Sequence, residues 1–181
     1  ITQTDLSSYF KNYEGSFVLF NSNRDSWTVY DMEHATHRIS PDSTYKIYDA
    51  LWGLEENIIT PQNSLLIWDG KDYPFEAWNT DLTLDSAMAA SANWYFQTID
   101  ERLSLTRIQN YLNKIEYGNK NIMGGLSSYW LESTLKISPV EQVELLKKLQ
   151  TNNLEFHSNN LQAVKNSILL SSVNDKKLYG K

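Results

Sequence analysis

The sequence contains no cysteine, no basic run and no long apolar run, and each absence removes a class of function. Without cysteine in any of the 181 residues, disulfides, thiolate nucleophiles and cysteine zinc sites are excluded. The 16 Lys and Arg residues are outnumbered by 22 Asp and Glu residues, which argues against a nucleic-acid groove. No apolar run approaches the ~20 residues needed to cross a bilayer.

The chain also lacks a signal peptide, an internal repeat and a low-complexity linker. A length of 181 residues is typical of one domain with a substantial core, so we expect a single domain over 1–181. The first residue is Ile1 rather than Met, which indicates a segment excised from a longer protein.

Strand patterns are present at both ends of the chain. Residues 15–20 and 26–31 flank the polar turn 21–25, which is typical of a hairpin, and 175–181 is similar to the entry of a strand. Helices are expected between these ends, so the pattern predicts an α+β fold whose sheet is completed by strands from both termini.

The helical segments are marked by apolar spacing and by capping residues. Ser138, Pro139 and Glu141 form a capping box, with proline at the first helical position where its missing N–H does no harm. The expected helices are 43–54, 82–103 with a break near Ser91, 106–117 stopped by Gly118, 139–152 and 161–172, with a loop over 57–82.

A serine and a lysine lie three residues apart at the start of the first helix. Ser43 and Lys46 are one helical turn apart and can touch. Lys46 shares a helix side with Ile47, Ala50 and Leu54, so it should be buried. Burial lowers the pKa of a lysine, which suits a base beside a serine hydroxyl. The free N–H groups of a helix start could hold an oxyanion.

The same spacing occurs a second time and by itself proves little. Ser133 and Lys136 precede the capping box at Ser138, so they lie outside a helix and are expected at the surface. For Ser43 and Lys46, a helix cap with a snorkelling lysine is the simpler explanation if the pair stands alone. Further motifs downstream show that it does not stand alone.

Downstream, the chain carries "SAN" at 91–93, "YGN" at 117–119, "YWLES" at 129–133 and a closing "YGK" at 179–181. Ser-x-x-Lys, Ser-x-Asn and a final Lys follow the motif order of penicillin-binding proteins and serine β-lactamases. Over 36–181 the chain resembles class D β-lactamases. Within that group it is similar to the extracellular sensor domains of the staphylococcal β-lactam sensor-transducers, those of methicillin resistance above all. The resemblance implies the β-lactamase and penicillin-binding transpeptidase fold, with further C-terminal strands beyond Lys181.

The resemblance assigns roles to the matching positions. Ser43 would be the nucleophile that becomes acylated, and Lys46 its base. In this family the lysine can be N-carboxylated by CO2, and no other cofactor or metal is implied. Ser91 would relay protons between Lys46 and the β-lactam nitrogen, and Trp130 matches the tryptophan that hydrogen-bonds the carboxylated lysine.

Three further positions follow from the same motifs. Tyr117 and Asn119 belong to the "YGN" motif, whose role is expected to be architectural rather than chemical. Lys181 would bind the carboxylate of the antibiotic, as the lysine of a Lys-Thr-Gly motif does, although no Thr and Gly follow it here.

Asn93 departs from the pattern of the hydrolytic enzymes, which carry an apolar valine there. A dry pocket favours the lysine carbamate that activates the deacylating water, whereas Asn93 brings an amide with donors and an acceptor. Our hypothesis is that Asn93 competes for Lys46 after acylation and promotes loss of the carbamate, which leaves the acyl group in place.

The expected function is therefore a β-lactam antibiotic receptor that stays acylated at Ser43. The resemblance implies the extracellular face of a Gram-positive plasma membrane, anchoring segments outside this chain, and a cytoplasmic metalloprotease region in the same polypeptide. Three alternatives stay open: a hydrolytic class D β-lactamase, a peptidoglycan DD-peptidase, and a non-catalytic wall-binding module that uses Trp68, Tyr73 and Trp78.

Overall fold

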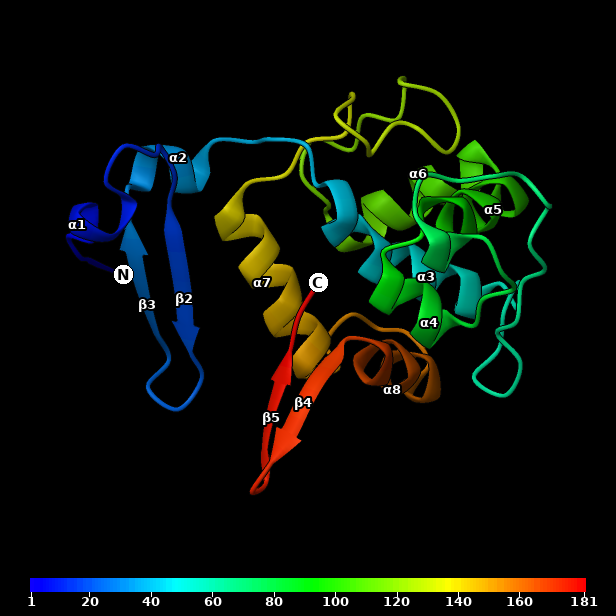
Figure 1. Ribbon diagram of the computed structural model, residues 1–181. Coiled ribbons are helices and arrows are strands. Elements are labelled where there is room, and N and C mark those ends of the chain that lie inside the picture. Colours follow the sequence, from blue (N-terminus) through cyan, green and yellow to red (C-terminus); the bar gives the residue numbers. More distant parts are fainter.

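The structure, a computed structural model, describes all residues 1–181 and confirms the α+β class, with helices between two small sheets (Figure 1). The strands are β1 (Thr2–Gln3), β2 (Phe17–Asn21), β3 (Ser26–Tyr30), β4 (Leu169–Val173) and β5 (Lys176–Tyr179). The helices are α1 (Ser7–Phe10), α2 (Met32–Thr36), α3 (Lys46–Glu55), α4 (Leu84–Ala90), α5 (Asn93–Leu103), α6 (Leu105–Ile115), α7 (Pro139–Gln150) and α8 (Ser158–Ser167), with 3-10 turns η1 (Asp42–Tyr45) and η2 (Glu76–Trp78). None of the helices combines the length and hydropathy of a bilayer span.

Within residues 1–181 the strands of the two ends form two separate small sheets. The predicted hairpin is confirmed as the antiparallel pair β2–β3, and β1 adds to β3 in parallel. At the other end β4 and β5 pair only with each other. No strand within 1–181 pairs with both β2 and β5, so the backbone ladders do not join.

Helix α3 lies within the helical region, where it packs against α5 and α8 (Figure 1). The expectation of one buried side is wrong, because every residue from Lys46 to Leu54 is buried. A helix that is covered all round offers a lysine no route to solvent along its own stem. This environment fixes the chemistry of Lys46.

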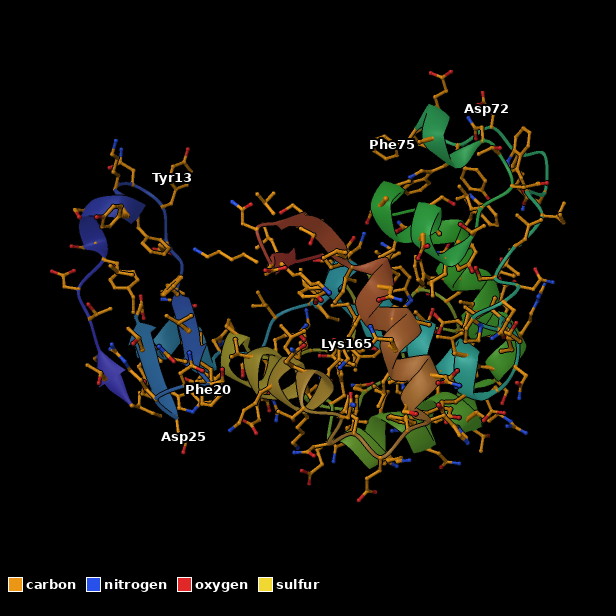
Figure 2. All side chains as sticks on the ribbon, turned by 90° about the horizontal axis from the view of Figure 1, so that it is seen from below. Tyr13, Phe20, Asp25, Asp72, Phe75 and Lys165 are labelled. Carbon is orange, nitrogen blue, oxygen red and sulfur yellow. The ribbon has the colours of Figure 1, made fainter.

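Helix α7 connects the helical region to the N-terminal sheet. Its capping box is confirmed, with the side chains of Ser138 and Glu141 each bonded to the backbone of the other. Lys147 of α7 lies 4.3 Å from the ring centre of Phe20 on β2. Figure 2 shows Phe20 beside α7, while Asp72 and Phe75 lie on the distant loop that carries η2.

Two helix ends differ from the sequence expectation. Helix α6 ends at Ile115, before Gly118, because the next residue, Glu116, adopts a left-handed φ of 57°. Helix α8 ends at Ser167, because Leu169–Val173 pairs with β5 as strand β4. Over so short a run apolar spacing does not separate a helix from a strand, and pairing with β5 decides here.

Candidate active site

The segment before α3 is tied to a distant loop, and this places Ser43. Ile39 and Ile137 form an isolated antiparallel bridge. The backbone N–H of Asp42 donates to the carbonyl of Trp130 at 3.1 Å, and the Asp42 carboxylate accepts from the N–H of Glu132 at 3.0 Å. Ser43 therefore lies in the 3-10 turn η1, one turn before the α-helix that was expected to begin with it.

Ser91 and Asn93 reach the same site because the helix breaks between them. Helix α4 ends at Ala90, the following Ser91 has a left-handed φ of 54° and ψ of 37°, and α5 begins at Asn93. In an unbroken helix, positions i and i+2 would point to different sides. The break expected near Ser91 is confirmed, and it turns both side chains toward Lys46.

Lys46 is the centre of the polar cluster. Its Nζ lies 2.9 Å from Ser43 Oγ, 3.2 Å from Ser91 Oγ and 2.7 Å from the amide oxygen of Asn93. The hydroxyls of Ser43 and Ser91 are 2.9 Å apart. Lys46 is fully buried, whereas both serines are half-buried, so a ligand can reach the hydroxyls while the amine stays beneath them.

Burial lowers the pKa of Lys46 from its usual 10.5 to about 7. The nearby charge of Lys181 lowers it further, while Asp49 and Asp42 act in the opposite direction. Near neutral pH a substantial fraction of the amine is therefore unprotonated. A neutral amine can accept the Ser43 proton on its lone pair while it donates to Asn93.

The face of the Trp130 ring lies against the amine of Lys46. The ring centre is 4.9 Å from Lys46 Nζ, and that of Phe96 is 5.8 Å away. The indole N–H of Trp130 donates to Asp100 Oδ2 at 2.8 Å. The resemblance had implied that this N–H serves a carboxylated lysine, but in this chain a carboxylate from α5 takes it.

The "YGN" motif holds a loop and touches no reacting group. Asn119 accepts from the N–H of Lys136 at 2.9 Å and donates to the carbonyl of Thr134 at 2.9 Å. Tyr117 is fully buried and packs edge-on against Tyr45 at 6.0 Å. These contacts connect the end of α6 to the segment that positions Ser43.

Gly118 occupies a place that no other residue can take without a shift. Its φ is +46°, and a Cβ there would overlap the carbonyl oxygen of Lys136. We expect Gly118→Ala to lower the free energy of unfolding by about 3 kcal/mol or more, from backbone strain plus the clash. Gly70→Ala is the matched control, since Gly70 has a φ of +80° and open space around it. Urea unfolding of both variants would contradict this explanation if their losses were equal.

Lys181 reaches the site from the end of β5. Its charge lowers the pKa of Lys46, and its Nζ donates to the carbonyl of Met88 on α4. A hollow of about 370 Å³ lies beside it and is lined by Thr44 and Ile47, among others. Lys181 is therefore a cation at the edge of the cluster formed by Lys46, Ser43 and Ser91.

The second Ser-x-x-Lys copy forms no such cluster. Ser133 and Lys136 lie outside any helix and are half-buried rather than fully at the surface. The N–H of Ser133 donates to Ser40 Oγ, and that of Lys136 to Asn119. These backbone hydrogen bonds hold loops together. Of the two copies, only Ser43 and Lys46 place an amine in contact with a hydroxyl.

The loop aromatics pack on one another and do not form an open platform. The indole N–H of Trp78 donates to the carbonyl of Ala90 at 2.9 Å, and that of Trp68 to Lys71 at 2.8 Å. The ring of Tyr73 stacks on Trp94 with centres 6.4 Å apart. This packing leaves little exposed aromatic surface that could bind the cell wall.

The sequence reading missed two buried acids below Lys46. Asp49 and Asp100 are fully buried on α3 and α5. Asp49 follows Lys46 by three residues and Asp100 follows Asn93 by seven, so each shares a helix face with a site residue. That spacing was the available signal.

A half-buried serine, a second serine and a buried lysine with a lowered pKa together form a serine acyl-transfer centre. The penicillin-binding protein transpeptidase domain matches this chain over residues 11–181. The solved C-terminal domain of the BlaR penicillin-receptor of Bacillus licheniformis is 43% identical, with a TM-score of 0.94, over 99% of this chain and 74% of that one. A class D β-lactamase of Bacillus subtilis is 36% identical, with a TM-score of 0.94, over 98% of this chain and 75% of that one. The methicillin resistance mecR1 protein of Staphylococcus aureus is 40% identical over 97% of this chain and 30% of its own length.

The chain belongs to the penicillin-binding transpeptidase domain family, in the group that contains the penicillin-receptor domains of the BlaR1 and mecR1 regulators and is related to class D β-lactamases. It spans 30% of the length of these regulatory relatives.

Proposed function

We propose that this domain is a receptor for β-lactam antibiotics that is acylated at Ser43 and remains acylated. The observation that carries the proposal is the position of Lys46 Nζ, which contacts Ser43 Oγ at 2.9 Å and the Asn93 amide oxygen at 2.7 Å. The first contact supplies a base for acylation. The second holds the same amine away from the acyl group once it has formed.

The acylation step uses the chain's own groups. Lys46 accepts the proton of Ser43, whose oxygen forms a bond to the lactam carbonyl carbon while the strained C–N bond breaks. Ser91 lies within reach of both, at 2.9 Å from Ser43 Oγ and 3.2 Å from Lys46 Nζ, and passes the proton to the departing nitrogen. Lys181 binds the carboxylate of the antibiotic.

The lifetime that this proposal requires of the acyl ester can be compared with the turnover rate of a typical enzyme. A typical enzyme turns over at about 10 s⁻¹, so an acyl group that lasts on the order of an hour requires deacylation slower by about 10⁴–10⁵, or ~6 kcal/mol. Loss of a general base accounts for about 10²–10⁴. Poor access of water to the ester must supply the rest.

The proposal extends to the longer protein by way of its relatives. In that longer protein the domain would lie on the extracellular face of a Gram-positive plasma membrane, anchored by segments outside this chain. Acylation by a β-lactam then signals to a cytoplasmic metalloprotease region of the same polypeptide, and resistance is induced.

Reaction with a chromogenic cephalosporin tests the function on the full-length protein. We expect a burst of one equivalent and a covalent mass shift at Ser43, absent in Ser43→Ala. Steady turnover would indicate a hydrolytic class D β-lactamase, and release of D-Ala from a peptide would indicate a DD-peptidase. Absence of any reaction would leave the wall-binding module.

A further inference from the structure

The break between α4 and α5 is attached on both sides to one residue of the loop that carries η2. The indole N–H of Trp78 donates to the carbonyl of Ala90, directly before Ser91, at 2.9 Å. The indole N–H of Trp94, directly after Asn93, donates to the carbonyl of Trp78 at 2.8 Å. Trp78 therefore bonds one flank of the break with its side chain and the other with its backbone. We call Trp78 and Trp94 the indole pair.

The backbone at the break is in a conformation that needs support. The left-handed φ of 54° at Ser91 is costly for a residue other than glycine, and it persists only where the surrounding structure enforces it. Helix α4 supplies part of that support, since the N–H of Ala92 donates to the carbonyl of Ala87 at 3.0 Å. The carbonyl of Ala90 lies in the last turn, where helical partners run out, and the Trp78 indole serves it.

The loop that carries Trp78 is itself closed. The N–H of Tyr73 donates to the side-chain oxygen of Asn79 at 2.8 Å, and the Asn79 amide donates back to the Tyr73 carbonyl at 3.1 Å. The centre of the Tyr73 ring is 6.1 Å from that of Trp78 and 6.4 Å from that of Trp94. The indole pair is therefore held by ring packing and by a closed loop, so its two bonds join the break to a fixed support.

We propose that Trp78 and Trp94 are positioning residues that hold the break so that Ser91 and Asn93 both face Lys46. Ser91 Oγ lies 3.2 Å from Lys46 Nζ, and the Asn93 amide oxygen lies 2.7 Å from it. The indole pair acts on both side chains through the backbone and takes no part in proton transfer. The inference deepens the proposed function and rests on it, because Ser91 serves acylation and Asn93 serves the persistence of the ester.

Loosening the break has opposite effects on the two chemical steps. A displaced Ser91 passes the proton to the departing nitrogen less well, and a misplacement of about 1 Å costs about 10²-fold in rate. A displaced Asn93 releases the amine of Lys46, which then takes a proton from water. The water oxygen bonds to the ester carbon while the bond to Ser43 Oγ breaks, and the serine oxygen regains a proton. Acylation therefore slows and deacylation speeds up, which a loss of stability alone does not produce.

Trp78→Phe and Trp94→Phe test the inference on the full-length protein. Each variant keeps an aromatic ring and removes one N–H donor. We expect the acylation rate at saturating fluorescent penicillin to fall by about 10–10²-fold, and deacylation, followed by mass spectrometry, to be faster by about tenfold or more. The double variant should exceed the larger single effect by no more than about threefold, because both bonds support the same break.

Trp68→Phe is the matched control. Trp68 is half-buried like Trp78, and its indole N–H also donates to a backbone carbonyl, that of Lys71 at 2.8 Å, but this bond does not involve the break. Both rates should stay within a factor of about two of the wild type. Unchanged acylation in the folded Trp78 and Trp94 variants, equal changes in the control, or single effects that simply multiply in the double variant would overturn the inference.

A second replacement keeps the test decisive if a Phe variant does not fold. Benzothienylalanine at position 78 or 94 retains the shape of the indole and carries sulfur in place of the N–H. It should reproduce the slower acylation and the faster deacylation, and a protein with wild-type rates would refute the inference.

Asn93→Ala separates this inference from the proposed function. Faster deacylation in Asn93→Ala but not in Trp78→Phe or Trp94→Phe would refute the indole pair alone. If Asn93→Ala deacylates as slowly as the wild type, the proposed role of Asn93 is refuted, and the acylation rate then judges the indole pair: a fall supports it and no change overturns it. A wild type that turns over steadily would refute the receptor proposal alone.

Discussion

Replacing Lys46 with methionine slows the acylation of Ser43 by about 10²–10⁴, because the base that removes the serine proton is lost. Methionine retains much of the stem volume at a fully buried position, so the cost in packing is small. The rate is measured with a fluorescent penicillin on the full-length protein. Near-UV circular dichroism establishes that the variant is folded.

Lys136→Met is the matched control for this prediction. Lys136 also follows a serine by three residues, but its side chain makes no bond to Ser133 and lies outside the cluster. Acylation should stay within a factor of about two of the wild type, as is usual for changes away from the reacting groups. Equal loss in both variants would show that the geometry around Lys46 is not what activates Ser43.

The order of the elements was predictable from local patterns. The hairpin β2–β3, the capping box of α7 and the break at Ser91 each depend on a few neighbouring residues, and the sequence contains all of them. The pairing of β4 with β5 depends on contacts outside the local spacing, which explains why Ile168–Ser172 was assigned to a helix. Whether strands from the two ends pair with one another also depends on contacts across the whole sheet, which local sequence patterns do not reveal.

The site was predictable as a set of residues but not in its electrostatics. Ser43, Lys46, Ser91 and Asn93 meet as the motif order suggested. The partner of the Trp130 indole was not foreseen, because it depends on how α5 packs against the 129–133 loop. Asp49 and Asp100 share helix faces with Lys46 and Asn93, but acids are rarely buried, so this spacing alone does not separate a buried acid from a solvated one.

The acylation rate should rise with pH through a midpoint near 7. The pKa of Lys46 is lowered from 10.5 to about 7, so the amine is protonated and inactive below that pH and neutral above it. Each pH unit below the midpoint removes about tenfold of the active form, so acylation at pH 5 should be about a hundredfold slower than at pH 8. Single-turnover rates at saturating antibiotic give this profile free of binding effects.

Two charge variants should move the midpoint in opposite directions. Lys181 lowers the pKa of Lys46, so Lys181→Gln should shift the midpoint to higher pH. Asp42 raises the pKa of Lys46, so Asp42→Asn should shift the midpoint to lower pH, while the amide oxygen still accepts from Glu132 and tolerates the φ of 44°. A loss of antibiotic affinity in Lys181→Gln would appear in the concentration dependence and not in the midpoint. A rate that is constant from pH 5 to 8, or midpoints that do not move, would mean that a group other than Lys46 removes the Ser43 proton.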